Sequence, residues 1–424
     1  MTAVRAQLSH VFPRGSRVGD RGHLEIGGCD TIELAERFGT PAYVIAEDDL
    51  RFRARAFSEA MRAGGADGEV LFASKALPCT AVYRVLAEEG LGCDVASGGE
   101  LHLALRGGFD PGRIYLHGNA KSRAEMRMAV EAGVGHVVVD SFDDIGRLGS
   151  VAKEAERPVR VLVRVTPDVA GETHAAVSTG QADSKFGFGV ADAGEAIARL
   201  RESESLDLRG LHVHIGSQLF SLEPFRAAVA AIAPLGDFPV YNLGGGLAAA
   251  YTSTQEPPSI ETYVQAKLAA ARELLGAGKH IIIEPGRSLV ANSGVTLYTI
   301  ETVKRNVSTW VAVDGGMSDN LRPMLYGAPY EAVLAERPLA TGGEPCRVAG
   351  KHCESGDVLI GETWLDDPRP GEVLVTPATG AYGHALANNY NGIPRPPVIF
   401  CREGQAHEVV RRETYDDLTS RDRV

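Results

Sequence analysis

The sequence predicts a closed (β/α)8 (TIM) barrel joined to a mainly antiparallel β domain. Three observations carry this prediction: eight short β-branched runs alternate with helix-like stretches, each run ends in polar or glycine residues, and the alternation stops near residue 293. Strands that alternate with helices indicate parallel βαβ units, and a count of eight favours a closed barrel over an open sheet. We expect an N-terminal segment 1–32, a barrel 33–290 and a C-terminal β domain 291–424.

Each expected barrel strand is a short apolar run with a polar end. The eight runs are 70–75, 92–97, 113–119, 136–141, 160–167, 210–217, 240–246 and 280–287. The stretches between them include PCTAVYRVLAEEG and SRAEMRMAVEAG, whose last glycines are typical of helix C-caps. In such barrels the strand ends and the loops after them build the active site. The strand-end residues expected to converge are Lys75, Asp94, His117, Asn119, Asp140, Arg164, His214, Ser217, Gly244, Gly245, Gly246, Glu284 and Arg287.

Lys75 closes the first run, VLFASK. Lysine is among the residues least often buried, so its place at the end of a core strand needs a reason. A side chain that snorkels to the surface is the structural alternative. Because the strand ends converge, we instead expect Lys75 to point into a cavity at the C-terminal end of the barrel.

The last third of the chain has strands without long helices between them. GVTLYTIETVKR, TWVAVDGG, EVLVTPATG and PPVIFCR are strand-like and indicate an antiparallel β domain. The segments SHVFPRGSRV and HLEIGG near the N-terminus are strand-like too, and they precede a helical pattern. We therefore expect residues 1–32 to join the C-terminal domain.

Composition and charge exclude several classes of protein. The net charge is −12 and no basic patch is present, so nucleic acid and anionic membranes are not expected partners. No apolar run reaches the roughly 18 residues that span a bilayer, and the first residues lack the apolar region of a secretory signal. The six cysteines form no CxxC pair, which predicts reduced thiols of a cytoplasmic protein, with neither a disulfide framework nor a zinc site.

Three motifs complement the strand-end lysine. NLGGGLA (242–248) places three glycines after a strand, where backbone N–H groups can approach a phosphate. IIIEPGRS (281–288) adds a carboxylate and an arginine, and HVHIGSQ (212–218) adds an imidazole and a hydroxyl. The loops after strands seven and eight are the recurrent phosphate site of this fold. Together these groups suggest pyridoxal 5′-phosphate, held by Lys75 as a Schiff base.

The same motifs carry a family resemblance. FASKA, HVHIGSQ, NLGGG and EPGR resemble the barrel motifs of fold-type III pyridoxal-phosphate decarboxylases. The motifs that resemble diaminopimelate decarboxylases in particular are THAAVSTGQADSKFGF (173–188), VDGGMSDNLRPMLYGAPY (313–330), GKHCESGD (350–357) and TGAYGHALANNYN (379–391). The resemblance implies decarboxylation of meso-2,6-diaminopimelate, a small-molecule amino-acid substrate, to L-lysine and CO2. It also implies a head-to-tail homodimer with shared active sites.

The resemblance implies roles around the cofactor. Lys75 would bind it covalently and shuttle protons, Glu284 would face the pyridine nitrogen, and His214 would stack on the ring. A carboxylate facing that nitrogen keeps it protonated, so the ring can accept electrons when CO2 leaves. The phosphate would be held by Ser217, Gly245, Gly246 and Gly286. Three further residues expected around the cofactor are Asp94, Arg287 and Tyr382, and Asp94 is as well explained by strand-end structure.

The substrate would be recognised by opposite charges at its distal end. Arg287 and Arg322 suit the distal carboxylate, since a guanidinium binds a carboxylate bidentately. Glu354 suits the distal ammonium. Tyr326 and Tyr382 would be hydroxyl partners at the substrate. The family implies that Cys353, the expected proton donor, and Glu354 enter the site of the neighbouring subunit.

Other functions stay open on sequence alone. A pathway-specific decarboxylase of the same fold could act on another amino acid, and the chain departs from the family pattern at Gly383, His384 and Ala385. A racemase of this fold would be expected to have an arginine, in place of Glu284, at the pyridine nitrogen. A non-catalytic pyridoxal-phosphate carrier would be a single barrel, which the second β domain disfavours. Lys185 and His384 have no assigned role.

Overall fold

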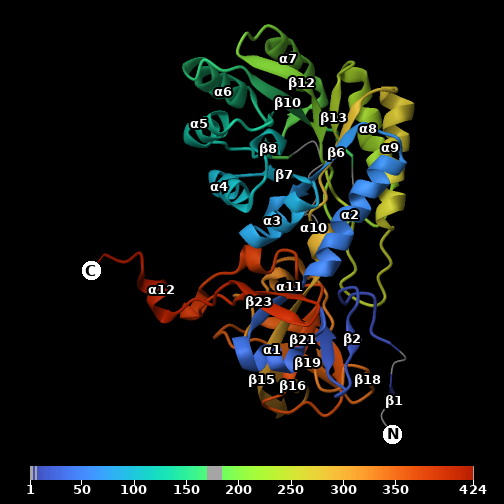
Figure 1. The fold of residues 1–424 in the computed structure, drawn as a ribbon, viewed down its shortest axis with the longest axis vertical. Coiled ribbons are helices and arrows are strands. Elements are labelled where there is room, and N and C mark those ends of the chain that lie inside the picture. The colour runs from blue at the N-terminus through green and yellow to red at the C-terminus, as the bar shows by residue number, and fades with distance from the viewer. Residues whose placement is uncertain (1–2, 5–6, 170–183, 424) are drawn as a thin grey trace. The chain divides into compact units, whose positions relative to one another are not determined.

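The structure is a computed structural model that describes residues 3–4, 7–169 and 184–423 (Figure 1). The chain forms two compact units, which we call the barrel unit and the β unit. The barrel unit consists of the described residues of Arg53–Ala248 and Pro257–Ser288. The β unit consists of the described residues of Met1–Phe52, Ala249–Glu256 and Leu289–Val424.

Eight parallel strands close into a ring in the barrel unit. In chain order they are β6 (Gly68–Ala73), β7 (Gly92–Val95), β8 (Ile114–Leu116), β9 (His136–Val139), β10 (Val159–Thr166), β12 (Leu206–Val213), β13 (Val240–Asn242) and β14 (His280–Ile283). Each strand pairs in parallel with the next, and β14 pairs with β6, so the sheet has no open edge. The predicted barrel of eight strands is confirmed, and β11 (Phe188–Gly189) adds a short pairing to β10.

Helices alternate with these strands, as the sequence pattern predicts. They are α3 (Thr80–Glu88), α4 (Gly98–Gly107), α5 (Arg123–Ala132), α6 (Phe142–Glu154), α7 (Val190–Arg201), α8 (Glu223–Ile232) and α9 (Ile260–Leu275), and α2 (Glu47–Ala63) precedes β6. Helix α5 shows why the sequence predicts where these helices begin and end. Ser122 and Glu125 form a capping box at its start, and Gly133 ends it in the left-handed conformation, with φ of 76°.

Side chains fill the centre of the barrel. A buried cluster draws one residue from each of six strands: Leu71, Tyr115, Val138, Leu162, Val240 and Ile282. A filled interior leaves no pore through the barrel. Polar chemistry is therefore confined to the strand ends and the loops beyond them.

The β unit is built on a nine-stranded sheet whose main path runs β20-β19-β16-β15-β5-β22-β23. Its strands are β5 (Ala42–Ala46), β15 (Gly294–Arg305), β16 (Thr309–Val313), β17 (Val333–Leu334), β19 (Glu344–Ala349), β20 (Val358–Leu365), β21 (Val373–Pro377), β22 (Val398–Arg402) and β23 (Gln405–Val410). Most pairs are antiparallel, and the parallel ones are β16 with β19 and β22 with β5. The smaller strands β1 (Ala3–Val4) and β18 (Ala340–Thr341) pair with each other, and β2 (Arg17–Val18), β3 (Leu24–Ile26) and β4 (Cys29–Asp30) form a third sheet.

Strand β5 extends the N-terminal contribution to the β unit beyond residue 32. It pairs with β15 and β22, so residues 42–46 lie in this sheet although the sequence pattern placed them with the barrel. All five of its residues are buried. The apolar run AYVIA directly precedes helix α2, so it reads in the sequence as one more βα unit.

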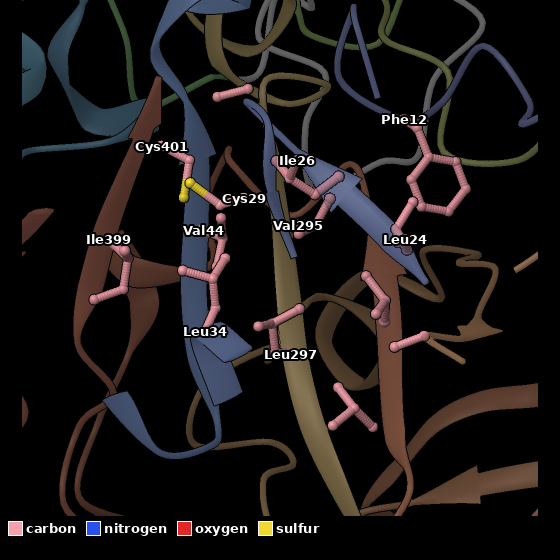
Figure 2. Close-up of a cluster of buried hydrophobic side chains, with 14 of the residues drawn as sticks. Phe12, Leu24, Ile26, Cys29, Leu34, Val44, Val295, Leu297, Ile399 and Cys401 are labelled. Atoms are coloured by element: carbon pink, nitrogen blue, oxygen red, sulfur yellow. The ribbon is translucent and has the colours of Figure 1, made fainter. Parts of the chain in front are cut away.

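The core of the β unit packs N-terminal strands against C-terminal ones (Figure 2). Val44 of β5, Val295 of β15 and Ile399 of β22 are fully buried in one cluster. Figure 2 shows the side chains of Cys29 and Cys401 directed toward one another. Helix α1 (Thr31–Phe38) begins at Asp30, whose carboxylate accepts hydrogen bonds from the first turn.

Two further properties concern the described residues as a whole. None of their helices has the length and apolar character needed to cross a membrane. All six cysteines are free thiols, of which Cys353 is exposed and the others are buried.

Candidate active site

Lys75 leaves the barrel wall directly after β6. It lies in a single 3₁₀ turn, η1 (Ser74–Ala76), between two buried neighbours, while its own side chain is exposed. The turn therefore fixes the backbone and presents the amine at the C-terminal end of the barrel. Burial is the main cause that lowers the pKa of His214 well below its usual value, and the positive charge of Lys75 is the second.

Glu284, just after β14, is the centre of a buried polar cluster. Its Oε1 lies 2.9 Å from Nε2 of His117 and accepts a hydrogen bond of 2.6 Å from Nδ2 of Asn242. Its Oε2 lies 3.2 Å from Nε2 of His212. All four side chains are buried. Three nitrogen groups from three strand ends therefore surround one carboxylate.

These neighbours set the charge of the cluster. Burial opposes ionisation of Glu284, but the charges and hydrogen bonds of His117 and His212 hold its pKa well below the usual range. Burial alone would lower the pKa of His117, yet Glu284 raises it above its ordinary value. Burial lowers the pKa of His212 to about 4 in spite of Glu284. Glu284 is therefore ionised at neutral pH, where it favours the charged form of His117, while His212 is a neutral donor.

Asp94, in β7, is the second buried carboxyl group of the site. Burial is the largest cause that raises its pKa to about 7, followed by the negative charge of Glu284. The positive charges of His117 and Lys75 act in the opposite sense. Asp94 therefore titrates near neutral pH, whereas Glu284 stays ionised.

The glycine turn after β13 brings bare backbone to the same end of the barrel. A Cβ on Gly245 would lie 2.2 Å from the carbonyl oxygen of Glu284, and one on Gly244 would lie 2.5 Å from that of Val213. Gly244 and Gly246 also have positive φ, at 63° and 116°. Only glycine fits such a close approach. The turn is linked to the site, because Gly245 N donates to Nδ1 of His214 at 3.2 Å.

Arg287 and Ser217 join the loops after β14 and β12. Nε of the buried Arg287 donates to Oγ of Ser217 at 3.1 Å. Gly286, the neighbour of Arg287, is packed so tightly that an added Cβ would lie 2.8 Å from that of Ala73. The structure thus brings together all the barrel residues predicted for the cofactor: Lys75, Asp94, His214, Ser217, Gly245, Gly246, Glu284, Gly286 and Arg287.

The segment before α7 lies against the ends of β9 and β10. Gly187 N donates to Oδ2 of Asp140 at 3.0 Å. The guanidinium of Arg164 lies 4.4 Å from the ring centre of Phe186, and the amine of Lys185 lies 5.0 Å from it. The rest of the motif 173–188, up to residue 183, lies outside the described residues.

Apart from Arg287, the predicted substrate residues lie in the β unit. Arg322 begins helix α11 (Arg322–Tyr326) and is buried. Its guanidinium carbon lies 4.1 Å from the ring centre of Tyr251, and Nη1 donates to the hydroxyl of Tyr330. Burial alone would lower the pKa of Arg322, but these two tyrosines and Tyr382 raise it above its usual value. Tyr382 itself has a positive φ of 60°, which is uncommon for a non-glycine residue.

Cys353 and Glu354 are exposed on one loop of the β unit. The loop is anchored by buried neighbours, since Nδ1 of His352 lies 2.7 Å from Oδ2 of Asp357. Cys353 N also donates to Oδ1 of Asn391 at 3.0 Å. Both predicted residues therefore project from a fixed loop.

His384, where the chain departs from the family pattern, is mostly buried. Its ring meets that of Tyr43 edge-on, with 5.9 Å between ring centres. Burial lowers the pKa of His384 to about 4, with a smaller effect from the charge of Arg395. His384 is therefore a neutral, packed imidazole.

Four residues of the barrel cluster received no role from the sequence: His117, His212, Asn242 and Lys267. A signal was present for three of them. His117 is a polar strand end, HVH places two imidazoles at alternate positions of a strand, and NLGGG begins with the asparagine. Lys267 carried no such signal, because it lies within a helical pattern.

Known proteins match this chain over almost its full length. Residues 47–291 match the family described as pyridoxal-dependent decarboxylase, pyridoxal binding domain. The chain is 45% identical over 426 residues to diaminopimelate decarboxylase from Bacillus subtilis (strain 168), a match that covers 96% of this chain and 97% of that protein. It is 47% identical over 437 residues to diaminopimelate decarboxylase from Actinosynnema pretiosum subsp. auranticum, covering 100% and 97%.

Solved structures agree with these matches. The structure of diaminopimelate decarboxylase from M. jannaschii in co-complex with L-lysine has a TM-score of 0.90 and 34% identity, and the match covers 97% of this chain and 98% of that one. The corresponding Helicobacter pylori enzyme complexed with L-lysine has a TM-score of 0.86 and 31% identity, covering 92% and 98%. This chain belongs to the diaminopimelate decarboxylases, which are pyridoxal-phosphate-dependent carboxy-lyases.

Proposed function

We propose that this diaminopimelate decarboxylase, which converts meso-2,6-diaminopimelate into L-lysine and CO2, uses the strand ends of the barrel unit as its cofactor site. The observation that carries the proposal is the buried, ionised Glu284, flanked by His117 and His212. A buried carboxylate held ionised is costly unless it has a task or full pairing. Here its partners leave it charged at the same end of the barrel as the exposed amine of Lys75.

Pyridoxal 5′-phosphate fits these groups on three counts. Lys75 offers a primary amine, the turn Gly244–Gly246 offers backbone into which no Cβ fits, and Glu284 offers an ionised carboxylate for a ring nitrogen. When bound, the cofactor supplies an acceptor for the electron pair that remains after CO2 leaves. Residues proposed to hold its phosphate are Ser217, Gly245, Gly246 and Gly286, and Arg287 and Tyr382 are proposed as further residues of the cofactor site.

The protein groups would then act on protons and orientation. Lys75 would hold the cofactor covalently and move protons at its own Nζ. Glu284 would keep a proton on the ring nitrogen, because an ionised carboxylate stabilises the protonated form. His214 is neutral, since burial lowers its pKa, and so would stack on the ring without adding charge. Asp94 would complete the polar surroundings.

We propose that Arg322 and Glu354 recognise the distal end of the substrate. Arg322 is a buried cation, and Glu354 is an exposed anion on the loop of Cys353. Arg287, Tyr326 and Tyr382 would complete this recognition. A lysine or ornithine substrate lacks the distal carboxylate, so it would leave the guanidinium unpaired.

The central assignment is tested by Lys75→Ala. Borohydride reduction of the cofactor-bound parent, followed by peptide mapping, should label Lys75. The variant should lose this label and nearly all release of CO2 from diaminopimelate. Lys153→Ala, at an exposed lysine of α6, is the matched control and should keep both. A label on another lysine of the parent would overturn the assignment.

We also propose a homodimer with shared active sites, in the cytoplasm, as part of lysine biosynthesis. Exposed Cys353 and Glu354 would reach the partner's site, with Cys353 as proton donor. Mixing inactive Lys75→Ala with inactive Cys353→Ala subunits should restore up to about a quarter of the activity, since random reassortment leaves one intact site in each heterodimer. No recovery after demonstrated subunit exchange would contradict shared sites.

A further inference from the structure

A fully buried lysine lies behind the glycine turn of the barrel unit. Lys267, on α9, has only 1% of its surface exposed. Its Nζ donates to the carbonyl oxygens of Leu243, Gly244 and Gly245, at 2.6, 2.7 and 3.2 Å. One side chain thus gathers three successive carbonyl groups of the turn.

The surroundings of Lys267 are those of a held cation. Its Nζ lies 4.7 Å from the ring centres of both Phe225 and Tyr263, within the range of cation–π contact. An ammonium has three donors and no acceptor, which matches three carbonyl oxygens that can only accept. A buried charge of this kind costs more stability than an apolar side chain of similar volume. Core packing alone therefore does not explain a lysine here.

The contacts of Lys267 determine where the other side of the turn points. In a planar trans peptide the C=O of one residue and the N–H of the next point in opposite directions. With the carbonyls of residues 243–245 directed at Lys267, the N–H groups of residues 244–246 point away from it. Gly244 N reaches Oδ1 of Asn242 at 3.0 Å, and Gly245 N reaches His214. Gly244 N and Gly245 N thus have acceptors in the cluster at the strand ends, and Gly246 N lies on the same side of the turn.

Successive N–H groups on one side of a turn form a concavity that binds anions. We propose that Lys267 is a positioning residue that shapes this concavity and places its charge behind it, and so sets the affinity of the protein for the phosphate of its cofactor. The inference rests on the proposed function, which places the phosphate at Gly245 and Gly246. Lys267 would touch neither the substrate nor the reacting atoms.

Burial and nearby charges act on the ammonium form of Lys267 in opposite senses. Burial lowers the pKa of Lys267 well below its usual value, and Glu284 acts weakly in the opposite sense. A phosphate on the far side of the turn would favour the ammonium form, because opposite charges attract strongly away from water. The ammonium, the turn and the phosphate would then stabilise one another.

The test compares pyridoxal phosphate with pyridoxal, which lacks the phosphate. Dissociation constants of both are measured on the apo forms of the parent, Lys267→Met and Lys267→Gln, and the ³¹P NMR signal of bound cofactor is recorded. Lys267→Met should weaken binding of pyridoxal phosphate on the order of 100-fold, leave pyridoxal within about threefold, and shift the ³¹P signal. Lys267→Gln keeps two N–H donors without the charge and should lose less.

Controls separate this inference from the proposed function. Lys153→Met, at an exposed position, should bind both ligands like the parent. At saturating cofactor, Lys267→Met should recover most of kcat. If the parent itself does not prefer pyridoxal phosphate, the phosphate assignment fails. If the parent prefers it and folded Lys267→Met or Lys267→Gln keeps the same preference, Lys267 is only structural and this inference is overturned.

Discussion

Glu284 in the barrel unit and Arg322 in the β unit are both buried charges, but they are partnered in different ways. Glu284 is surrounded by two imidazoles and an amide, and it raises the pKa of one of these imidazoles, that of His117. Arg322 is held by the ring face of Tyr251 and the hydroxyl of Tyr330. Among the described residues, no salt bridge includes Arg322.

The difference separates a charge whose partners all lie within the chain, which we call the completed site, from a charge that can still pair with a ligand, which we call the receptive charge. The anion of the barrel has its hydrogen-bonding partners within the chain, so the cluster is assembled before anything binds. The cation of the β unit has aromatic neighbours that orient it but do not neutralise it. An uncompensated, oriented guanidinium is suited to a carboxylate that arrives with a ligand. The comparison therefore supports a cofactor role for the first region and a substrate role for the second.

The largest expected effect comes from removing the receptive charge. Arg322→Leu should lower kcat/KM for diaminopimelate, mainly by raising KM, because the distal carboxylate loses its partner. The decrease should correspond to a loss of about 3 kcal/mol of transition-state stabilisation. The same change should penalise lysine as a substrate far less, since lysine has no distal carboxylate. Steady-state kinetics with both amino acids checks this.

A matched control exists in the same unit. Arg347 also lies over an aromatic ring, 5.3 Å from that of Trp310, but it is exposed. Arg347→Leu should leave both substrates unchanged. Equal losses for diaminopimelate and lysine in Arg322→Leu would make Arg322 structural, and the contrast between the two regions would lose its functional meaning.

The next largest effect is the pH dependence of stability that Asp94 causes in the barrel unit. Asp94 has a pKa of about 7 in the folded chain, against about 4 for an ordinary aspartate. Between these values the folded state binds more protons than the unfolded state, so this group makes stability fall as pH rises. We therefore compare the free energy of unfolding of apo Asp94→Asn with that of the apo parent. The value for the variant minus that for the parent should increase by about 2 kcal/mol as the pH rises from 5 to 8.

Denaturant unfolding at each pH measures this difference. Asp143→Asn, at an exposed carboxylate of α6, should show no such trend. A constant difference between Asp94→Asn and the parent across this range would mean that burial and the charge of Glu284 do not raise the pKa of Asp94 as described.

The smallest effect concerns the orientation of the receptive charge. Tyr330→Phe removes the hydroxyl that accepts from Arg322 and keeps the ring. The kcat/KM for diaminopimelate should fall about fivefold, or about 1 kcal/mol, with kcat nearly unchanged. Tyr415→Phe, at an exposed tyrosine, is the control. A loss as large as that of Arg322→Leu would show that the hydroxyl does more than orient the guanidinium.

Much of the fold follows from local pattern. The eight strands and the change of pattern near residue 293 are visible because hydrophobic periodicity and helix caps are properties of neighbouring residues. Strand β5 was assigned to the wrong unit because its partners β15 and β22 are distant in sequence. An apolar run before a helix reads the same in either unit.

In the site, too, some residues are predicted by local sequence patterns, and others depend on contacts between distant parts of the chain. Lys75, Glu284 and the glycine turn are visible as polar or glycine ends of apolar runs. The pairing of His212 with Glu284 depends on the register of three strands, in which His212 lies beside Asn242 and Asn242 beside Ile282. No local pattern encodes that register. Lys267 reads as an exposed helical lysine, and only the packing of α9 reveals its contacts.

The pairing of β14 with β6 has a consequence for how the protein is made. Lys75 follows the first barrel strand and Glu284 the last, so about half of the chain is synthesised between them. A nascent chain that stops before β14 has an open sheet edge and lacks the carboxylate. Such non-local contacts form late and slowly. Acquisition of the cofactor would thus report that the ring has closed, and incomplete chains would emerge from the ribosome without it.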